Sequence, residues 1–91
     1  MLERDIEKKV CDYAKLHQML AYKFTSPGHI GVPDRMFITL DGRIFFIEFK
    51  SEKGKLTPNQ QRENLRLINR GVDVYTVNNV ENGKKIIDAK T

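Results

Sequence analysis

Arg43-Ile44-Phe45-Phe46-Ile47-Glu48-Phe49-Lys50 is the stretch of sequence that decides the fold. Side chains alternate between the two faces of a β-strand, so Glu48 and Lys50 project from the same face as Phe46. Both faces are apolar up to Glu48, which predicts a strand in the middle of a sheet. A carboxylate and an ammonium at the end of such a strand are costly to bury unless they pair, bind a metal or reach a cleft. The stretch therefore predicts a central strand with a functional site at its C-terminal end.

The segment before this strand, residues 35–40, is also rich in β-forming residues, and Asp41-Gly42 joins the two as a strong hairpin signal. A two-residue turn would place Asp34 opposite Phe49, on the wrong face for Glu48. A type I turn over residues 39–42, with Gly42 left-handed, adds a bulge and places Asp34 opposite Glu48. Aspartate third and glycine fourth favour the type I turn. We therefore predict the bulged register.

Apolar spacing and turn residues predict the elements on the N-terminal side. Residues 2–20 carry apolar side chains at helical spacing with charges on the other side, which predicts a helix. Residues 21–24 are expected to form a short strand. Two glycines and two prolines predict a loop over residues 26–33.

The C-terminal half begins with a polar loop over residues 51–56 and a clear helix start. Thr57 as N-cap, Pro58 as the first helical residue and Gln60 as the third form a capping box. Gly71 predicts that this helix ends after Arg70. A strand over residues 72–77 and a helix over residues 78–89, weakened by Gly83, complete an α/β domain built on one mixed sheet.

Length and composition limit the class of protein. A chain of 91 residues with 40% hydrophobic and 31% charged residues is expected to form one soluble globular domain, residues 1–91. The single cysteine, Cys11, excludes an internal disulfide and a cysteine-rich zinc site, and we expect it to fill the core. No apolar stretch approaches the ~18 residues of a membrane span, and Glu3, Asp5 and Glu7 interrupt any signal-like run. A cytoplasmic protein with no membrane contact is therefore expected.

The net charge of +4 comes from 16 basic and 12 acidic residues and is unevenly spread. Residues 41–70 hold 7 basic and 4 acidic side chains. A polyanionic partner and a merely solubilising basic surface explain this excess about equally well. The basic residues concerned are Arg43, Lys50, Lys53, Lys55, Arg62, Arg66 and Arg70.

Two carboxylates and a lysine are expected to meet at one edge of the sheet. Asp34 and Glu48 offer the oxygen ligands that Mg²⁺ or Mn²⁺ prefers, and the backbone carbonyl of Phe49 is a further candidate ligand. Such a metal activates water and offsets negative charge in phosphodiester hydrolysis. Lys50 is placed to orient that water or to stabilise the developing charge.

These residues carry a family resemblance. Pro33-Asp34, thirteen intervening residues and Glu48-Phe49-Lys50 resemble the PD-(D/E)xK nuclease motif. The longer set over residues 2–77, with Ser26-Pro27-Gly28, Gly31-Val32-Pro33-Asp34-Arg35 and Leu56-Thr57-Pro58-Asn59-Gln60, resembles the VRR-NUC branch and its small phage and bacterial members. The resemblance implies a restriction-endonuclease-like α-β-β-β-α-β core, metal-dependent cleavage of DNA, and a likeness to homodimeric Holliday-junction resolvases. Residues 78–91 match nothing in it.

The resemblance also assigns roles to residues outside the central set. The first-helix acidic residue of the family falls on Glu7, with Glu3 as the second choice, and would touch the metal through water; an exposed helical charge is the plain alternative. Gln60 matches the family's helix glutamine and would reach toward the lysine or the scissile phosphate, although helix capping alone explains it. Lys53 and Lys55 are expected to contact phosphate rather than only to solvate a turn.

Other polar residues are weaker candidates for DNA contact. Arg62, with Arg66 and Arg70, forms a stripe on its helix that is either a DNA track or a solubilising face. Arg35 either balances the charge of Asp34 or touches DNA. The remaining candidates lie in the loop, where backbone amides at Ser26, Gly28 and Gly31 could approach a phosphate and where His29 is expected to be solvated.

The leading hypothesis is a divalent-metal-dependent DNA endonuclease acting on branched DNA such as four-way junctions. A non-catalytic DNA-binding module of the same fold is the alternative, and a flap or restriction-like nuclease is a third reading. Resolving a junction needs two nicks, so we expect a homodimer. Exposed loop residues such as Ile30 and Val32 are candidates for its interface.

Overall fold

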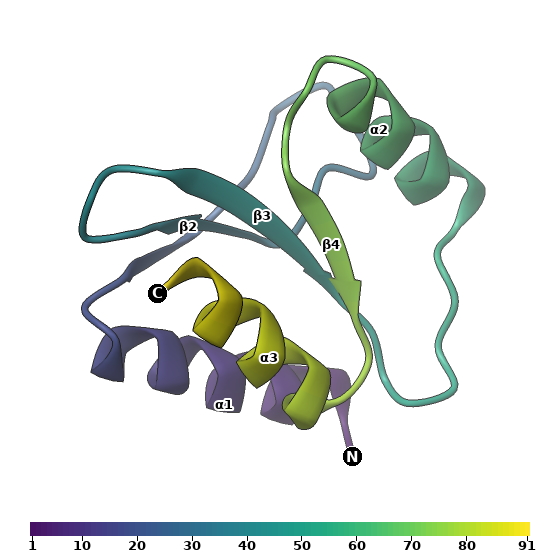
Figure 1. The fold of residues 1–91 in the computed structure, drawn as a ribbon. Helices are drawn as coiled ribbons and strands as arrows, with labels where there is room; N and C mark the ends of the chain where they lie inside the picture. Colours follow the sequence, from purple (N-terminus) through teal and green to yellow (C-terminus); the bar gives the residue numbers. More distant parts are fainter.

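A four-stranded mixed sheet forms the centre of the computed structural model, which describes residues 1–91 (Figure 1). The strands follow the order β1 (Leu20–Lys23), β2 (Arg35–Ile38), β3 (Ile44–Phe49) and β4 (Val74–Val77). β1, β2 and β3 are antiparallel neighbours, and β4 is parallel to β3. All residues of β3 except the first are buried, so the prediction of an inner strand is confirmed.

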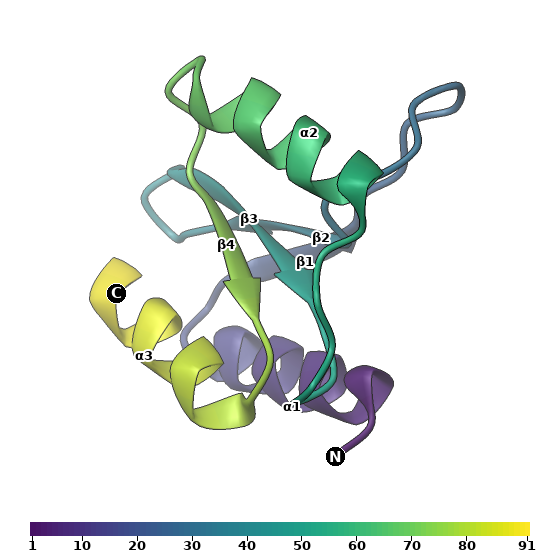
Figure 2. The same cartoon turned by 90° about the vertical axis from the view of Figure 1, so that its right-hand side faces the viewer.

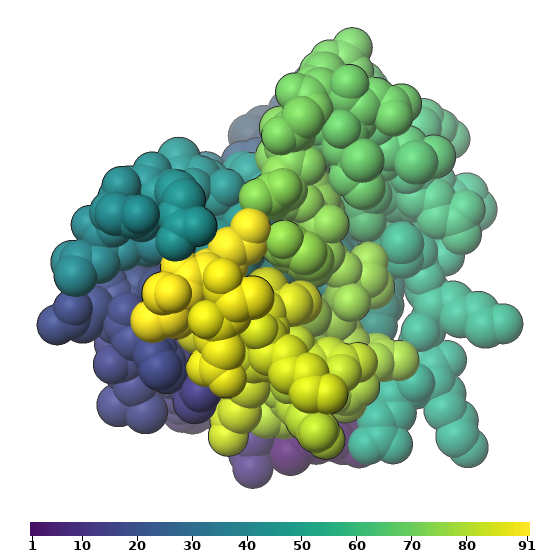
Figure 3. Space-filling view, viewed as in Figure 1, coloured from purple at the N-terminus to yellow at the C-terminus, as the bar shows by residue number.

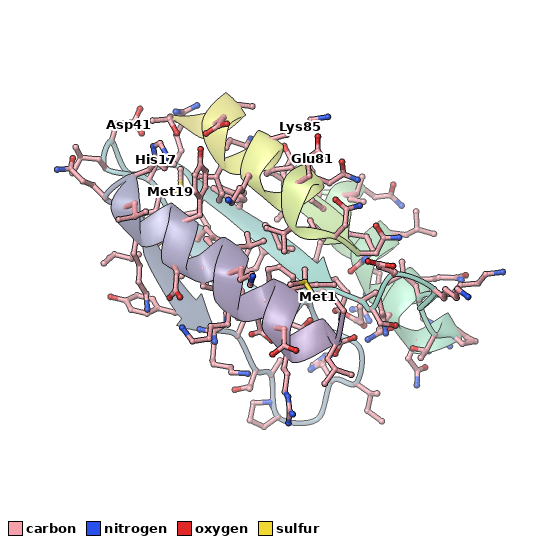
Figure 4. The ribbon with its side chains drawn as sticks, turned by 90° about the horizontal axis from the view of Figure 1, so that it is seen from below. Met1, His17, Met19, Asp41, Glu81 and Lys85 are labelled. Atoms are coloured by element: carbon pink, nitrogen blue, oxygen red, sulfur yellow. The ribbon has the colours of Figure 1, made fainter.

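Three helices cover the two faces of this sheet. α1 (Glu3–Leu16) and α3 (Val80–Lys90) lie on one face, and α2 (Pro58–Ile68) lies on the other (Figure 2). Seen from below, α1 and α3 run side by side beneath the strands (Figure 4). The mixed α/β architecture predicted from the sequence is therefore confirmed. No helix combines the length and the apolar character that crossing a membrane requires.

The main core lies between the sheet and the α1–α3 pair. Its buried members include three phenylalanines of β2 and β3, the apolar stripe of α1, and Ile87 of α3. Cys11 belongs to this core, as predicted, and burial raises the pKa of its thiol. Gly83 lies where α3 meets α1, and a Cβ there would come within 2.4 Å of a Val10 methyl group. The glycine expected to weaken α3 is thus what lets the two helices approach.

The β2–β3 hairpin has the bulged turn. The amide of Gly42 donates to the carbonyl of Thr39 (3.0 Å), and Gly42 is left-handed with φ +87°. Arg35 pairs with Ile47, so the next position along β2 places Asp34 opposite Glu48. The two-residue turn is excluded, and the register that brings the two carboxylates together is confirmed.

The ends of several elements differ from the predicted ones for local reasons. α1 stops at Leu16 instead of residue 20, because Gln18 is left-handed (φ 63°) and Met19 turns inward. β2 ends at Ile38 because the turn already begins at Thr39. α3 begins at Val80, two residues later than predicted, because the Asn79 side chain caps it by accepting from the Asn82 amide.

Candidate active site

Asp34 and Glu48 lie side by side at the end of the β2–β3 ladder, on the face of the sheet that α2 covers. The Phe49 amide donates to Asp34 Oδ2 at 2.8 Å, which fixes the aspartate carboxylate against β3. Glu48 is the most buried charged residue of the chain, with 1% of its surface exposed. The strand period and the bulged turn together produce this pair, as the sequence predicted.

Gln60 connects the first turn of α2 to Glu48. Its side-chain oxygen accepts from the Thr57 amide (2.9 Å), and the Thr57 hydroxyl accepts from the Gln60 amide (3.2 Å), so the predicted capping box is present. Its side-chain nitrogen then donates to Glu48 Oε2 at 3.0 Å. The Gln60 amide therefore caps α2 through its oxygen and contacts Glu48 through its nitrogen. The expected contact with Lys50 is replaced by this one with Glu48.

The second oxygen of Glu48, Oε1, is buried and accepts no hydrogen bond from an N–H or O–H group of the chain. Burial is the main cause that raises the pKa of Glu48 to about 8, followed by the nearby negative charge of Asp34 and a hydrogen bond with it. Lys50 opposes this rise in pKa and Glu3 adds to it. In the metal-free protein Glu48 therefore holds a proton near neutral pH, because Lys50 compensates the negative charge of its ionised form only in part.

Lys50 follows β3 directly and is half-buried. Its amide donates to the carbonyl of Val77 at 2.8 Å, which ties the end of β3 to the end of β4. Because its ammonium lowers the pKa of Glu48, Lys50 is electrostatically part of the same cluster. The three residues predicted to meet, Asp34, Glu48 and Lys50, are brought together.

Glu7 does not join this cluster. Its carboxylate accepts from Arg35 Nε at 2.6 Å and lies 3.5 Å from Lys23 Nζ, on the opposite face of the sheet from Glu48. That Glu7 touches a metal through water stays a prediction, and in this structure its carboxylate is engaged by Arg35 and Lys23. Glu3, the second choice, is the first-helix residue whose charge adds to the rise in the pKa of Glu48. Arg35 donates to Glu7 and to the carbonyl of Ala21, so its guanidinium is occupied within the chain.

The donor set fits a hard divalent cation held by few protein ligands. No group of three or more His, Cys, Asp or Glu side chains is placed to hold a metal. Asp34 and Glu48 nevertheless present carboxylate oxygens, one of them buried and unpartnered. Mg²⁺ is typically bound by one or two carboxylates, with water and substrate phosphate completing its ligands. The pair therefore matches this type of site better than a closed structural one.

Basic side chains of the 51–56 loop and of α2 differ in how far they are engaged within the chain. Lys53 and Lys55 are exposed in the loop between β3 and α2, which stands out from the body of the molecule with long side chains extended into solvent (Figure 3). Arg62 is also exposed and unpaired. Arg66 pairs with Glu63 at 3.1 Å, and Arg70 donates to the carbonyl of Arg66. The predicted stripe on α2 is thus only partly available to a ligand.

The two glycines of the 26–33 loop have different structural roles. Gly28 (φ +84°) faces open space, whereas a Cβ on Gly31 (φ +98°) would lie 2.6 Å from the Asn59 carbonyl group. Gly31 therefore seats the loop against the first turn of α2, and only Gly28 leaves its backbone open. Ser26 Oγ lies 3.4 Å from the Nδ1 atom of His29.

Comparisons with known proteins agree with this geometry. The VRR-NUC domain family model matches residues 3–81, which reaches into α3. A protein named "Putative nuclease p44" from Acyrthosiphon pisum secondary endosymbiont phage 1 is 41% identical over 75 residues, covering 82% of this chain and 81% of that protein. A solved structure titled "VRR_NUC domain" superposes with a TM-score of 0.88 at 30% identity and covers 98% of this chain and 97% of its own. This chain therefore belongs to the VRR-NUC domain family of nucleases.

Proposed function

We propose that the protein is a divalent-metal-dependent DNA endonuclease whose reaction centre is Asp34, Glu48 and Lys50. The observation that carries the proposal is the buried, unpartnered oxygen of Glu48 beside a second carboxylate. A chain that only binds DNA gains nothing from two carboxylates near phosphate, because they repel it. A cation between them removes that repulsion.

Asp34, Glu48 and the backbone carbonyl of Phe49 are the proposed ligands for Mg²⁺ or Mn²⁺. When bound, such an ion activates a water molecule and neutralises charge on the phosphodiester. Asp34 is already oriented by the Phe49 amide, so little reorganisation of its side chain is needed. Glu48 must release its proton on binding, because the free carboxyl has a pKa of about 8.

Three further side chains assist in the proposal. The Lys50 ammonium orients the attacking water or stabilises negative charge that develops on the phosphate. Gln60 holds Glu48 Oε2 and leaves Oε1 free of donors from the chain. Glu3 takes the outer role that the sequence assigned to Glu7, because its charge acts on Glu48.

DNA contact is assigned to exposed cations that form no ion pair within the chain and to neutral donors of the 26–33 loop. Lys53 and Lys55 on the protruding loop and Arg62 on α2 are exposed cations suited to backbone phosphates. Ser26 and the open backbone at Gly28 supply neutral donors from the other side.

Selectivity for branched DNA and a homodimer complete the proposal. Two nicks in a four-way junction require two reaction centres, and a two-fold dimer supplies them by symmetry. Of the two loop residues named for the interface, Ile30 is 77% exposed and Val32 is half-buried. Ile30 is therefore the better candidate.

One cleavage assay tests the proposal. The protein is incubated with Mg²⁺ or Mn²⁺ on a four-way junction, a flap, plain duplex and single-stranded DNA, beside Asp34→Ala and Lys50→Ala. Lys85→Ala is the matched control, because it removes an exposed lysine that pairs only with Glu81 on α3. We expect junction cleavage by the wild type and the control, and its loss in the two site variants.

The outcomes separate the alternatives. Binding without any cutting would support the non-catalytic DNA-binding module. Preferred cutting of the flap, or of duplex at one fixed sequence, would replace the junction preference with the flap or restriction-like reading. Light scattering with junction DNA tests the dimer, and a strict monomer would contradict it.

A further inference from the structure

We propose that the cavity between the 24–32 loop and α2 binds one unpaired DNA base close to the scissile phosphate. The inference rests on the proposed function, because it names the part of the DNA that this nuclease recognises. The cavity has a volume of about 220 Å³. Its lining residues are Phe24, Ser26, His29, Val32, Glu63, Arg66, Leu67 and Arg70.

The lining divides into an apolar part and a polar part. Phe24, Val32 and Leu67 present the apolar surface on which the flat face of a base can lie. The polar side chains come from both walls, with Ser26 and His29 on the loop and Arg66 on α2. Base edges carry hydrogen-bond donors and acceptors at fixed positions, so a cavity lined by both apolar and polar side chains suits a base.

Glu63 favours a base over a phosphate as the occupant. Its carboxylate lines the cavity and pairs with Arg66 at 3.1 Å, so it would repel a phosphate. The same carboxylate can accept from an exocyclic amino group of a base. Arg70 donates to the carbonyl of Arg66, which holds a second cationic side chain at this wall.

The cavity is directly connected to the carboxylate pair. The Phe24 amide donates to the Asp34 carbonyl at 2.9 Å. The Phe24 ring packs on the Phe46 ring with centroids 5.0 Å apart, and Phe46 precedes Glu48 by two positions on the same face of β3. A base in the cavity therefore belongs to a nucleotide near the one whose phosphate is cut.

Part of the loop wall packs on α2 in the absence of DNA. Gly31 lies against the backbone of Asn59, where an added Cβ would come within 2.6 Å, so this part of the loop cannot move away without breaking the contact. A preformed site loses little freedom on binding. A paired base must first leave its stack, whereas a base at a branch or bulge is already free, so the cavity gives a physical reason for preferring branched DNA.

The test compares binding of two duplexes in metal-free buffer, where no cleavage interferes. Both carry one unpaired nucleotide, with its base present in one and removed as an abasic site in the other. The wild type is expected to bind the intact duplex about tenfold more tightly. Arg66→Gln and Ser26→Phe, which fills the cavity, are expected to bring the two affinities within about twofold of each other. Circular dichroism checks that both variants fold.

Arg62→Gln is the matched control, because it removes the same charge from the same helix one turn before Arg66, at a residue that does not line the cavity. It is expected to weaken binding to both duplexes and to keep their ratio. Equal wild-type affinity for the two duplexes would overturn the proposal, as would an unchanged ratio in folded Arg66→Gln and Ser26→Phe. Failure of the proposed function is separate, because it appears only as absence of cleavage when Mg²⁺ or Mn²⁺ is added.

Discussion

Asp34 and Arg35 are neighbours in the chain, but they point to opposite faces of the sheet and meet different partners. On the α1 side, Arg35 and Glu7 form a closed ion pair at 2.6 Å. On the α2 side, Asp34 meets Glu48, and no cation of the chain contacts the buried Oε1 atom of that glutamate. One glutamate has its charge balanced within the protein, and the other requires something from outside. This difference separates a residue that holds the fold from one that we propose serves the reaction.

The two faces of the sheet also differ in how completely their side chains are buried. The α1–α3 face is closed over the core, with Phe37, Phe45 and Phe49 fully buried. On the α2 face, Tyr22 of β1 and Ile44 of β3 remain 53% and 51% exposed. The α1–α3 face therefore holds the main core, whereas the face that carries Asp34 and Glu48 is only partly covered by α2.

Glu48→Gln is expected to have the largest effect, and it tests directly whether Glu48 lacks a compensating partner within the chain. We expect cleavage to fall by about 10²–10³-fold or more, because an anionic ligand is lost while the shape is kept. The metal-free protein should become more stable by about 1–3 kcal/mol, because the amide removes an uncompensated buried acid. Cleavage rates in Mg²⁺ and urea unfolding in EDTA measure the two effects. Activity close to wild type would show that Glu48 is not a ligand.

The pH dependence of stability tests whether the pKa of Glu48 is raised in the folded protein. Folding raises the pKa of Glu48 from 4.5 to about 8, so between these values the folded protein holds a proton that the unfolded chain has released. Its contribution to stability is therefore lost as pH rises through this window. The stability advantage of Glu48→Gln in EDTA should grow from about pH 5 to about pH 8. A constant difference across this range would place Glu48 in an ordinary solvated environment.

On the other face, Arg35→Ala is expected to lower the free energy of unfolding by about 2 kcal/mol, because it leaves the mostly buried Glu7 without its main partner. Cleavage per folded molecule should stay within a few-fold of wild type. Lys85→Ala, which removes only a surface i,i+4 pair, should cost at most about 0.5 kcal/mol. A loss of cleavage by Arg35→Ala without a loss of stability would instead make Arg35 part of the site.

A further comparison concerns two glycines of the loop that borders the site. Gly31→Ala and Gly28→Ala both place a side chain at positive φ, but only the first collides with the Asn59 carbonyl. Gly31→Ala should therefore be less stable than Gly28→Ala by about 1–2 kcal/mol in urea unfolding. Equal stabilities would mean that the loop is not seated on α2.

Local rules predicted the central site well. The Asp41-Gly42 turn and the strand period together place Asp34 opposite Glu48, and Thr57 with Gln60 predicts the start of α2. Both features depend on residues close in sequence, where the geometry of turns and caps leaves few choices.

Contacts between distant elements could not be predicted in the same way. Whether Glu3 or Glu7 faces the acidic pair depends on how α1 is rotated over the sheet, and both lie on one side of the helix. The buried position of Gly83 likewise depends on how α3 meets α1. The alternation of side chains along β2 offered one usable indication. Arg35 lies on the face opposite Asp34, where a half-buried cation needs an acidic partner from α1.

The Gln60 amide has a consequence for how this chain tolerates insertions and deletions. Because Glu48 is held from the start of α2, the spacing between the strand and the helix is fixed by a contact at its end and not by the length of the 51–56 loop. Extending a flexible loop costs little, about 0.6 kcal/mol for each doubling. Lengthening this loop should therefore cost the fold little, whereas inserting one residue between Thr57 and Gln60 would break the cap and release Glu48 together.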